Sequence, residues 1–293
     1  MVRTEPARTE PARAAAVRAA AVRTSSARSE PARTEPLDRT VAGTGPGLVL
    51  LHGTGADAVS NWGPLVDAVR DRYTVVAPNL PGAGATPVDL GPIDLDTLAD
   101  RVVATARSAG LERFHLVGHS LGAVVATSVA ARHPDAVTSL ALHAGWVRTT
   151  PREAFMFDLW ARLLRTDPAL LARHLILTAM GPGLLGTLDG AGFAELTAGF
   201  AAMLDDRILG QLELDARVDL RDAVGRVVAP ALVLASADDQ VVPPHHQREL
   251  AGALRGAEYL EVPGGHGLPF EDPARFFAIL AEYVDRQQAL ARD

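Results

Sequence analysis

Three side chains in this sequence are of the types that together could turn a serine into a nucleophile: Ser120, Asp239 and His266. A serine hydroxyl is a weak nucleophile at neutral pH, so it needs a base within hydrogen-bonding distance and a third group that orients the base. Histidine supplies such a base, and aspartate supplies the orienting carboxylate. The chemistry expected of this set is attack on a carbonyl carbon, provided that folding brings the three residues together.

The local sequence around Ser120 predicts a sharp turn between a strand and a helix. The pentapeptide 118–122, Gly-His-Ser-Leu-Gly, follows an apolar run at 114–117 and precedes a segment of small residues at 123–131. Glycines two residues before and two after the serine are needed because a side chain there would collide with the adjoining strand or helix. We therefore expect a nucleophile elbow, with the serine held in a strained backbone conformation.

Asp239 and His266 each follow a predicted strand. Asp239 comes after the apolar run 231–235, and His266 lies in the Pro-Gly-Gly-His-Gly segment 263–267, which comes after the run 259–262. The carboxyl ends of parallel strands share one edge of a sheet, so both side chains are expected near Ser120. The order serine, aspartate, histidine along the chain is the one that accompanies this type of elbow.

From residue 47 onward, short apolar runs alternate with helical patterns, and these elements must position the three residues. This alternation of short apolar runs with helical patterns predicts an α/β fold, with a mostly parallel sheet and helices on both faces. We expect a further strand near 38–42, at a shortened first edge of the sheet. The strands are predicted at 48–51, 73–77, 114–118, 139–143, 231–235 and 259–262.

Residues 147–217 break this alternation and predict an inserted helical lid between two strands. Helical patterns are expected at 152–164, 168–180, 192–203 and 206–214. The lid divides the body of the protein into residues 37–146 and 218–293. Its apolar side chains exceed what one amphipathic face requires, so some of them are expected to line a substrate cavity and to exclude water from it.

Over roughly residues 38–290 the chain resembles the α/β-hydrolase family. Besides the elbow and the two loops with Asp239 and His266, the resemblance rests on His-Gly-Thr-Gly at 52–55 and Asn-Leu-Pro-Gly-Ala-Gly at 79–84. It implies that Ser120 is the nucleophile, His266 the general base and Asp239 the acid that orients His266. The family usually places this acid four residues before a proline, here Pro243, which favours Asp239 over its neighbour Asp238.

The resemblance also implies where the oxyanion and the substrate bind. The backbone amides of Thr54 and Leu121 are expected to form the oxyanion hole, and losing one such donor typically costs roughly 3–4 kcal/mol of transition-state stabilisation. Five further residues are expected to contact the substrate. Two of them lie beside the serine, and three lie in or near the lid. They are Gly53, His119, Trp146, Phe157 and Trp160.

Together these features predict a serine hydrolase that cleaves an ester, lactone or thioester of a small to medium apolar molecule through an acyl-enzyme. Two alternatives stay open: a non-hydrolytic enzyme of the same fold (a lyase, a cyclase or a C–C bond hydrolase, as in natural-product tailoring) and a ligand-binding receptor without turnover. No cofactor and no metal site is expected, because the sequence holds neither a metal-binding cluster nor a phosphate-binding glycine loop.

The composition argues against some classes of binding partner. The chain of 293 residues has a net charge of −7, which argues against nucleic acid, and it contains no cysteine for disulfides. No apolar run is long enough for a membrane span, and none resembles the core of a signal peptide. We therefore expect a cytoplasmic protein that binds a small molecule, in an oligomeric state that the sequence leaves open.

The first 36 residues stand apart from the rest. Arginine recurs every five residues from Arg3 to Arg33, with Thr-Glu-Pro-Ala and alanine-rich units between. A period of five fits neither a helix nor a strand, and the prolines interrupt both. Residues 1–36 are therefore predicted to form a disordered, low-complexity arm, with docking of this arm on a partner as the alternative.

Overall fold

The computed structural model describes residues 35–291. Almost all of the predicted N-terminal arm, residues 1–36, lies outside the described residues, so its prediction stays untested. Among the described residues, no helix is both long and apolar enough to cross a membrane.

A seven-stranded sheet forms the centre of the described part, in the order β1-β3-β2-β4-β5-β6-β7. β1 is antiparallel to β3, and all other neighbours are parallel. The predicted α/β class and the edge strand near 38–42 are confirmed. The strands are β1 (Arg39–Ala42), β2 (Gly47–Leu51), β3 (Thr74–Pro78), β4 (Phe114–His119), β5 (Val137–His143), β6 (Ala231–Ser236) and β7 (Glu258–Val262).

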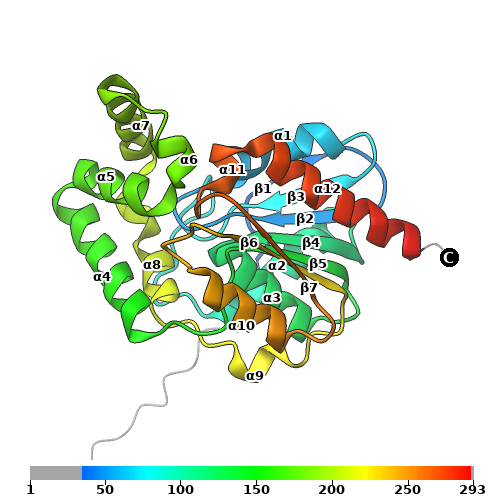
Figure 1. Cartoon of the computed structure of the whole chain (residues 1–293). Helices are drawn as coiled ribbons and strands as arrows, with labels where there is room; N and C mark the ends of the chain where they lie inside the picture. Colours follow the sequence, from blue (N-terminus) through cyan, green and yellow to red (C-terminus); the bar gives the residue numbers. More distant parts are fainter. Residues whose placement is uncertain (1–34, 292–293) are drawn as a thin grey trace, which may run out of the picture. The chain divides into compact units, whose positions relative to one another are not determined.

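Helices cover both faces of this sheet (Figure 1). α1 (Ala58–Val69) and α12 (Pro273–Leu290) pack on one face, and α2 (Leu95–Ser108), α3 (Leu121–Arg132) and α10 (Pro244–Ala253) pack on the other. Alternate residues of a strand point to opposite faces, so Leu48 and Leu50 of β2 join the core under α1 and α12, whereas Val49 and Leu51 join the core under α3. Because both faces of the sheet are buried, the inner strands have almost continuously apolar sequences.

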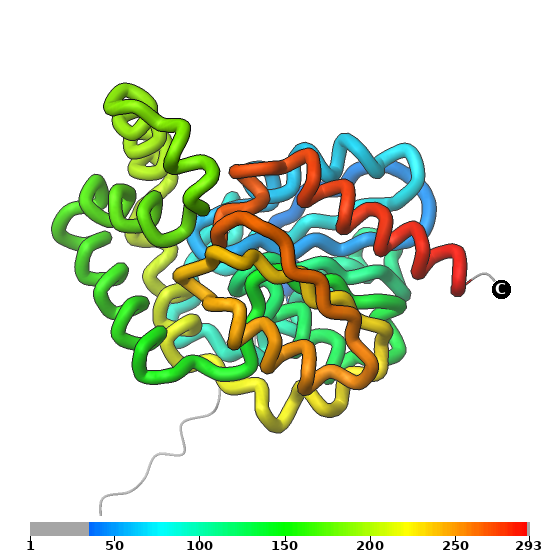
Figure 2. Tube along the Cα trace, viewed as in Figure 1, coloured from blue at the N-terminus to red at the C-terminus, as the bar shows by residue number. Residues whose placement is uncertain are grey.

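The regular structure between β5 and β6 consists of helices. We call residues 147–217 the insertion; in Figure 2 they form the green and yellow-green part of the tube beside the sheet. Its first residues pair with the residues that directly follow it, since the Thr149 amide donates to the Val218 carbonyl and the Leu220 amide to the Val147 carbonyl. Its helices are α4 (Pro151–Thr166), α5 (Pro168–Ala179), α6 (Pro182–Leu185), α7 (Gly190–Met203), the 3₁₀ turn η1 (Asp206–Ile208) and α8 (Leu209–Asp215).

Local sequence explains where the helices of the insertion begin. At α4, Thr150 and Glu153 form a capping box and Pro151 occupies the first turn, where its missing amide hydrogen is not needed. Asp167 caps α5 by accepting a hydrogen bond from the Leu170 amide. Two short helices complete the described chain: α9 (Arg221–Val224) and α11 (Leu268–Glu271).

Candidate active site

Ser120 lies at the turn between β4 and α3 in a conformation that is rare for a residue with a side chain. Its φ is 54° and its ψ is −121°. A Cβ on Gly118 would lie 2.3 Å from the Gly122 carbonyl oxygen, and a Cβ on Gly122 would lie 2.1 Å from the Leu51 carbonyl oxygen. The two glycines therefore let the helix approach the sheet closely enough for the strained turn to form.

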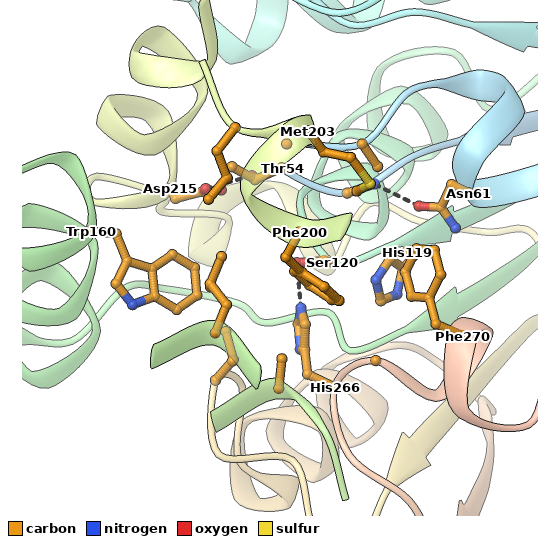
Figure 3. Close-up of a pocket in the computed structure, with 18 of the residues that line it drawn as sticks. Thr54, Asn61, His119, Ser120, Trp160, Phe200, Met203, Asp215, His266 and Phe270 are labelled. Carbon is orange, nitrogen blue, oxygen red and sulfur yellow. Dashed lines mark hydrogen bonds between the residues drawn. The ribbon is translucent and has the colours of Figure 1, made fainter. Parts of the chain in front are cut away.

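The structure brings His266 to the serine hydroxyl. His266 lies between β7 and α11, and its Nε2 is 3.0 Å from Ser120 Oγ (Figure 3). A side chain at the preceding glycine would have no room, because a Cβ on Gly265 would lie 2.4 Å from the Ala179 carbonyl oxygen at the end of α5. The Gly267 amide also donates to that carbonyl at 2.7 Å, so the insertion contacts the loop that carries the imidazole.

Asp239 orients the other side of the His266 ring. Its Oδ2 lies 2.9 Å from His266 Nδ1, and its Oδ1 accepts hydrogen bonds from the amides of Val241 (2.9 Å) and Val242 (2.8 Å). Only 3% of Asp239 is exposed. Asp238 instead accepts a hydrogen bond from the Gly264 amide at 3.3 Å, so of the two neighbouring carboxylates Asp239 is the one that contacts the imidazole.

Two further histidines are buried behind this group. His119 Nδ1 lies 2.9 Å from His143 Nδ1, and His143 Nε2 lies 2.9 Å from Ser236 Oγ. Burial, together with the neighbouring imidazoles, holds the pKa of His119 well below 6.5, and burial does the same for His143. Both rings are therefore neutral at pH 7. The two rings form a neutral hydrogen-bonded chain that reaches from Ser236 to the residue before the serine.

The backbone amides of Thr54 and Leu121 are the two predicted donors of the oxyanion hole. Neither donates a hydrogen bond to any group among residues 35–291. The loop that carries Thr54 is close to the serine, since a Cβ on Gly53 would lie 3.1 Å from Ser120 Cβ. Its start is held by His52, which lies 2.8 Å from the Gly53 carbonyl oxygen and whose pKa burial lowers to about 4.

The serine and the imidazole open into a small, mostly apolar cavity of about 100 Å³ between the sheet and the insertion. Four of the five residues expected to contact substrate line it: Gly53, His119, Phe157 and Trp160. Trp146 is not among the residues that line it. Its indole stacks on Phe157 and donates to Thr149 Oγ1 at 2.9 Å.

Several other residues that line the cavity were not predicted from the sequence. Apolar ones come from the insertion and from α11, namely Leu175, Met180, Phe200, Met203 and Phe270, and the polar Asn61 comes from α1. The most unusual is Asp215 of α8, which is 1% exposed and accepts a hydrogen bond from Thr54 Oγ1 at 2.6 Å. Burial raises its pKa to about 7. The sequence contained a signal for this residue: the spacing of Ile208, Leu212 and Asp215 is typical of one helix face, so the carboxylate is expected on the apolar face.

The comparisons with known proteins show the family. Residues 48–279 match the family model described as the alpha/beta hydrolase family. A pyrrolizixenacetamide deacetylase of Xenorhabdus hominickii is 34% identical, over 83% of this chain and 92% of its own length. A putative carbamate hydrolase, RutD, of Klebsiella pneumoniae is 29% identical, over 85% and 94% respectively.

Solved structures agree on the fold. The enol-lactonase from Burkholderia xenovorans LB400 superposes with a TM-score of 0.75 at 24% identity, covering 85% of this chain and 96% of that one. A thermophilic esterase from Thermogutta terrifontis gives a TM-score of 0.74 at 23% identity, covering 85% and 93%. At such identities the likeness establishes the fold alone.

Proposed function

Because this chain belongs to the alpha/beta hydrolase family, we propose that it is a serine hydrolase that cleaves an ester, lactone or thioester through an acyl-enzyme. One observation carries the proposal. His266 lies between Ser120 and Asp239, with its Nε2 3.0 Å from the hydroxyl and its Nδ1 2.9 Å from the carboxylate. Both distances are within hydrogen-bonding range for a nucleophile, its base and the group that orients the base.

In the proposed acylation step, Ser120 Oγ attacks the substrate carbonyl carbon while its proton passes to His266 Nε2. The carbonyl oxygen becomes an oxyanion that accepts hydrogen bonds from the amides of Thr54 and Leu121. When the tetrahedral intermediate collapses, the bond to the leaving group breaks and His266 returns the proton to it. The leaving group of an ester or thioester departs as an alcohol or thiol, whereas the hydroxyl of an opened lactone stays attached to the acyl group; in each case the acyl group stays on Ser120.

In the proposed deacylation step, water takes the place of the leaving group. His266 accepts a proton from the water as its oxygen attacks the acyl carbon, and the second tetrahedral intermediate breaks the bond to Ser120 Oγ. The serine recovers its proton from His266, and a carboxylic acid is released. Asp239 holds the Nδ1–H tautomer of His266 throughout, a role supported by the two backbone amides that hydrogen-bond to its carboxylate.

The insertion, residues 147–217, is proposed as a lid that sets the substrate class. Phe157 and Trp160 come from α4 and Phe200 comes from α7, and all three line the cavity beside Ser120. An apolar cavity of about 100 Å³ suits a small acyl group. The relatives named as a deacetylase and as carbamate hydrolases suggest that acyl–nitrogen bonds belong in any substrate panel. The cytoplasmic location stays a prediction.

The test combines a substrate panel with covalent labelling. Purified protein is assayed with p-nitrophenyl esters from acetate to octanoate, an enol lactone, a thioester and N-acetyl arylamides, and is treated with a fluorophosphonate probe before peptide mass spectrometry. We expect turnover of short acyl esters and modification of Ser120, with both lost in Ser120→Ala. Absence of turnover and of labelling in the folded wild type contradicts the proposal and favours a non-hydrolytic enzyme or a receptor.

A further inference from the structure

Two polar side chains of α8 hold the loop that carries Thr54. Gln211 and Asp215 are four residues apart and therefore lie on the same face of the helix. Gln211 Oε1 accepts a hydrogen bond from the Gly55 amide at 3.1 Å, and Asp215 Oδ2 accepts one from the Thr54 hydroxyl at 2.6 Å. Figure 3 draws Asp215 beside Thr54 at the rim of the cavity.

Both side chains are buried, with Gln211 at 0% and Asp215 at 1% exposure. Buried polar groups are costly unless they are hydrogen-bonded, so these contacts have an energetic reason to persist. Gln211 Nε2 also donates to the Pro81 carbonyl at 2.8 Å. The end of α8 is fixed in turn, because Thr149 Oγ1 donates to the Asp215 carbonyl at 2.5 Å.

The opposite side of the loop is held by the body of the protein. The Gly53 amide donates to Asn61 Oδ1 of α1 at 3.0 Å. The loop 53–55 is thus bonded to α1 at its first residue and to α8 at its second and third. The Thr54 amide lies at the junction, so its direction depends on both attachments.

We propose that Gln211 and Asp215 are positioning residues, through which the insertion holds the Thr54 amide in the direction needed to bind the oxyanion. This inference rests on the serine hydrolase function proposed above. With this positioning role, the insertion is part of the oxyanion site as well as a cover for the cavity, because any shift of α8 also shifts the loop. An interaction made only in the transition state changes kcat more than KM.

The protonation state of Asp215 adds a distinctive readout. Its Oδ1 has no hydrogen-bond partner among residues 35–291, and the imidazole of His266 is the titratable neighbour that acts on it there. Burial raises the pKa of Asp215 to about 7, so the carboxyl is neutral in mildly acidic solution and ionises above that value. Ionisation places a negative charge next to the loop that has to bind an oxyanion, and this opposes catalysis.

The first test needs no turnover. The Thr54 and Gly55 amide resonances are followed by NMR between pH 5.5 and 8.5 in the full-length wild type, in Asp215→Asn and in Glu213→Gln. Glu213 is an exposed carboxylate on the same helix and serves as the matched control. We expect both resonances to titrate near pH 7 in the wild type and in Glu213→Gln, and to lose this titration in Asp215→Asn. Resonances that titrate identically in all three proteins overturn the proposal.

The second test is kinetic. Asp215→Asn keeps an acceptor for the Thr54 hydroxyl, so we expect a rate near that of the wild type at pH 6.5 and a smaller decline above pH 7. Thr54→Val removes the hydroxyl without changing α8, and it is expected to lower kcat roughly 10-fold with KM within about 2-fold. Thr54→Ser retains the hydroxyl and is expected to restore most of the rate.

The outcomes separate the two proposals. If Thr54 titrates with Asp215 but the wild type neither hydrolyses substrate nor reacts at Ser120, the serine hydrolase function fails and the contact between α8 and the loop stands. If the wild type turns over substrate while Thr54→Val has unchanged kcat, the hydrolase function stands and the positioning role is overturned.

Discussion

The Nδ1 atoms of His119 and His143 lie 2.9 Å apart inside the protein, next to the turn that carries the serine. At this distance one ring donates its N–H and the other accepts, so the contact exists only while at least one of the two Nδ1 atoms is unprotonated. This contact beside the candidate active site therefore depends on pH.

Three buried histidines are expected to make the protein acid-sensitive. The pKa of His52 is lowered to about 4, and those of His119 and His143 lie well below 6.5. The unfolded chain takes up protons near pH 6.5 whereas the folded chain does not, so stability is complete above that pH and falls as the pH drops toward the folded-state values. The expected slope is at most about 1.4 kcal/mol per pH unit for each histidine.

Urea unfolding at pH 7 and pH 5 measures this effect. His143→Leu removes one of the three histidines, so it is expected to be less stable at pH 7 but to lose less stability on acidification. His245→Leu, at an exposed position, serves as the control and should follow the wild type. A pH-independent free energy of unfolding between pH 7 and pH 5 contradicts the prediction.

Gly122→Ala is expected to disrupt the serine turn. The new methyl group would lie 2.1 Å from the Leu51 carbonyl oxygen, so α3 must move away from the sheet. We expect a loss of at least about 2 kcal/mol in thermal or urea unfolding, together with loss of fluorophosphonate labelling. Gly252→Ala in α10 meets nothing within 4 Å and is the control; it should be neutral or slightly stabilising. Equal stability of the two variants would rule out the steric argument.

Asp239→Asn tests the orientation of His266. The substitution preserves the shape of the side chain but favours the wrong tautomer of the imidazole, so kcat is expected to fall by about 10³–10⁴-fold on the best ester. Among residues 35–291 the Asp238 carboxylate accepts a hydrogen bond from the Gly264 amide and none from His266, so Asp238→Asn should change kcat less than about 2-fold. A larger loss in Asp238→Asn than in Asp239→Asn would reverse the assignment of the acid.

Trp160 is expected to limit the length of the acyl group. Its indole lines the cavity, whereas that of Trp146 stacks on Phe157. Trp160→Ala should shift the preferred p-nitrophenyl ester toward longer acyl chains, seen as a rise in kcat/KM for octanoate relative to acetate. Trp146→Phe should leave that ratio unchanged while lowering stability by about 1 kcal/mol, because the bond to Thr149 is lost. An unchanged ratio in Trp160→Ala would contradict the lining role.

The amino-acid sequence by itself determined the order of the elements and the candidate serine turn. Both depend on local patterns: apolar runs of strand length, and glycines flanking Ser120 at positions where a side chain has no room. The choice of Asp239 also followed from local sequence, since its distance from Pro243 matched a known pattern. These signals are readable because the interactions behind them join residues that are close along the chain.

Only the tertiary structure decided which side chains of the insertion reach the cavity. Asp215 contacts Thr54 across 161 residues of chain, and Trp146 is not among the residues that line the cavity although it directly follows a strand at the site. Helical periodicity tells which face of a helix is buried but not what that face is buried against. The partner of a buried carboxylate is fixed by how the helices of the insertion dock on the sheet, which depends on packing between segments distant in sequence.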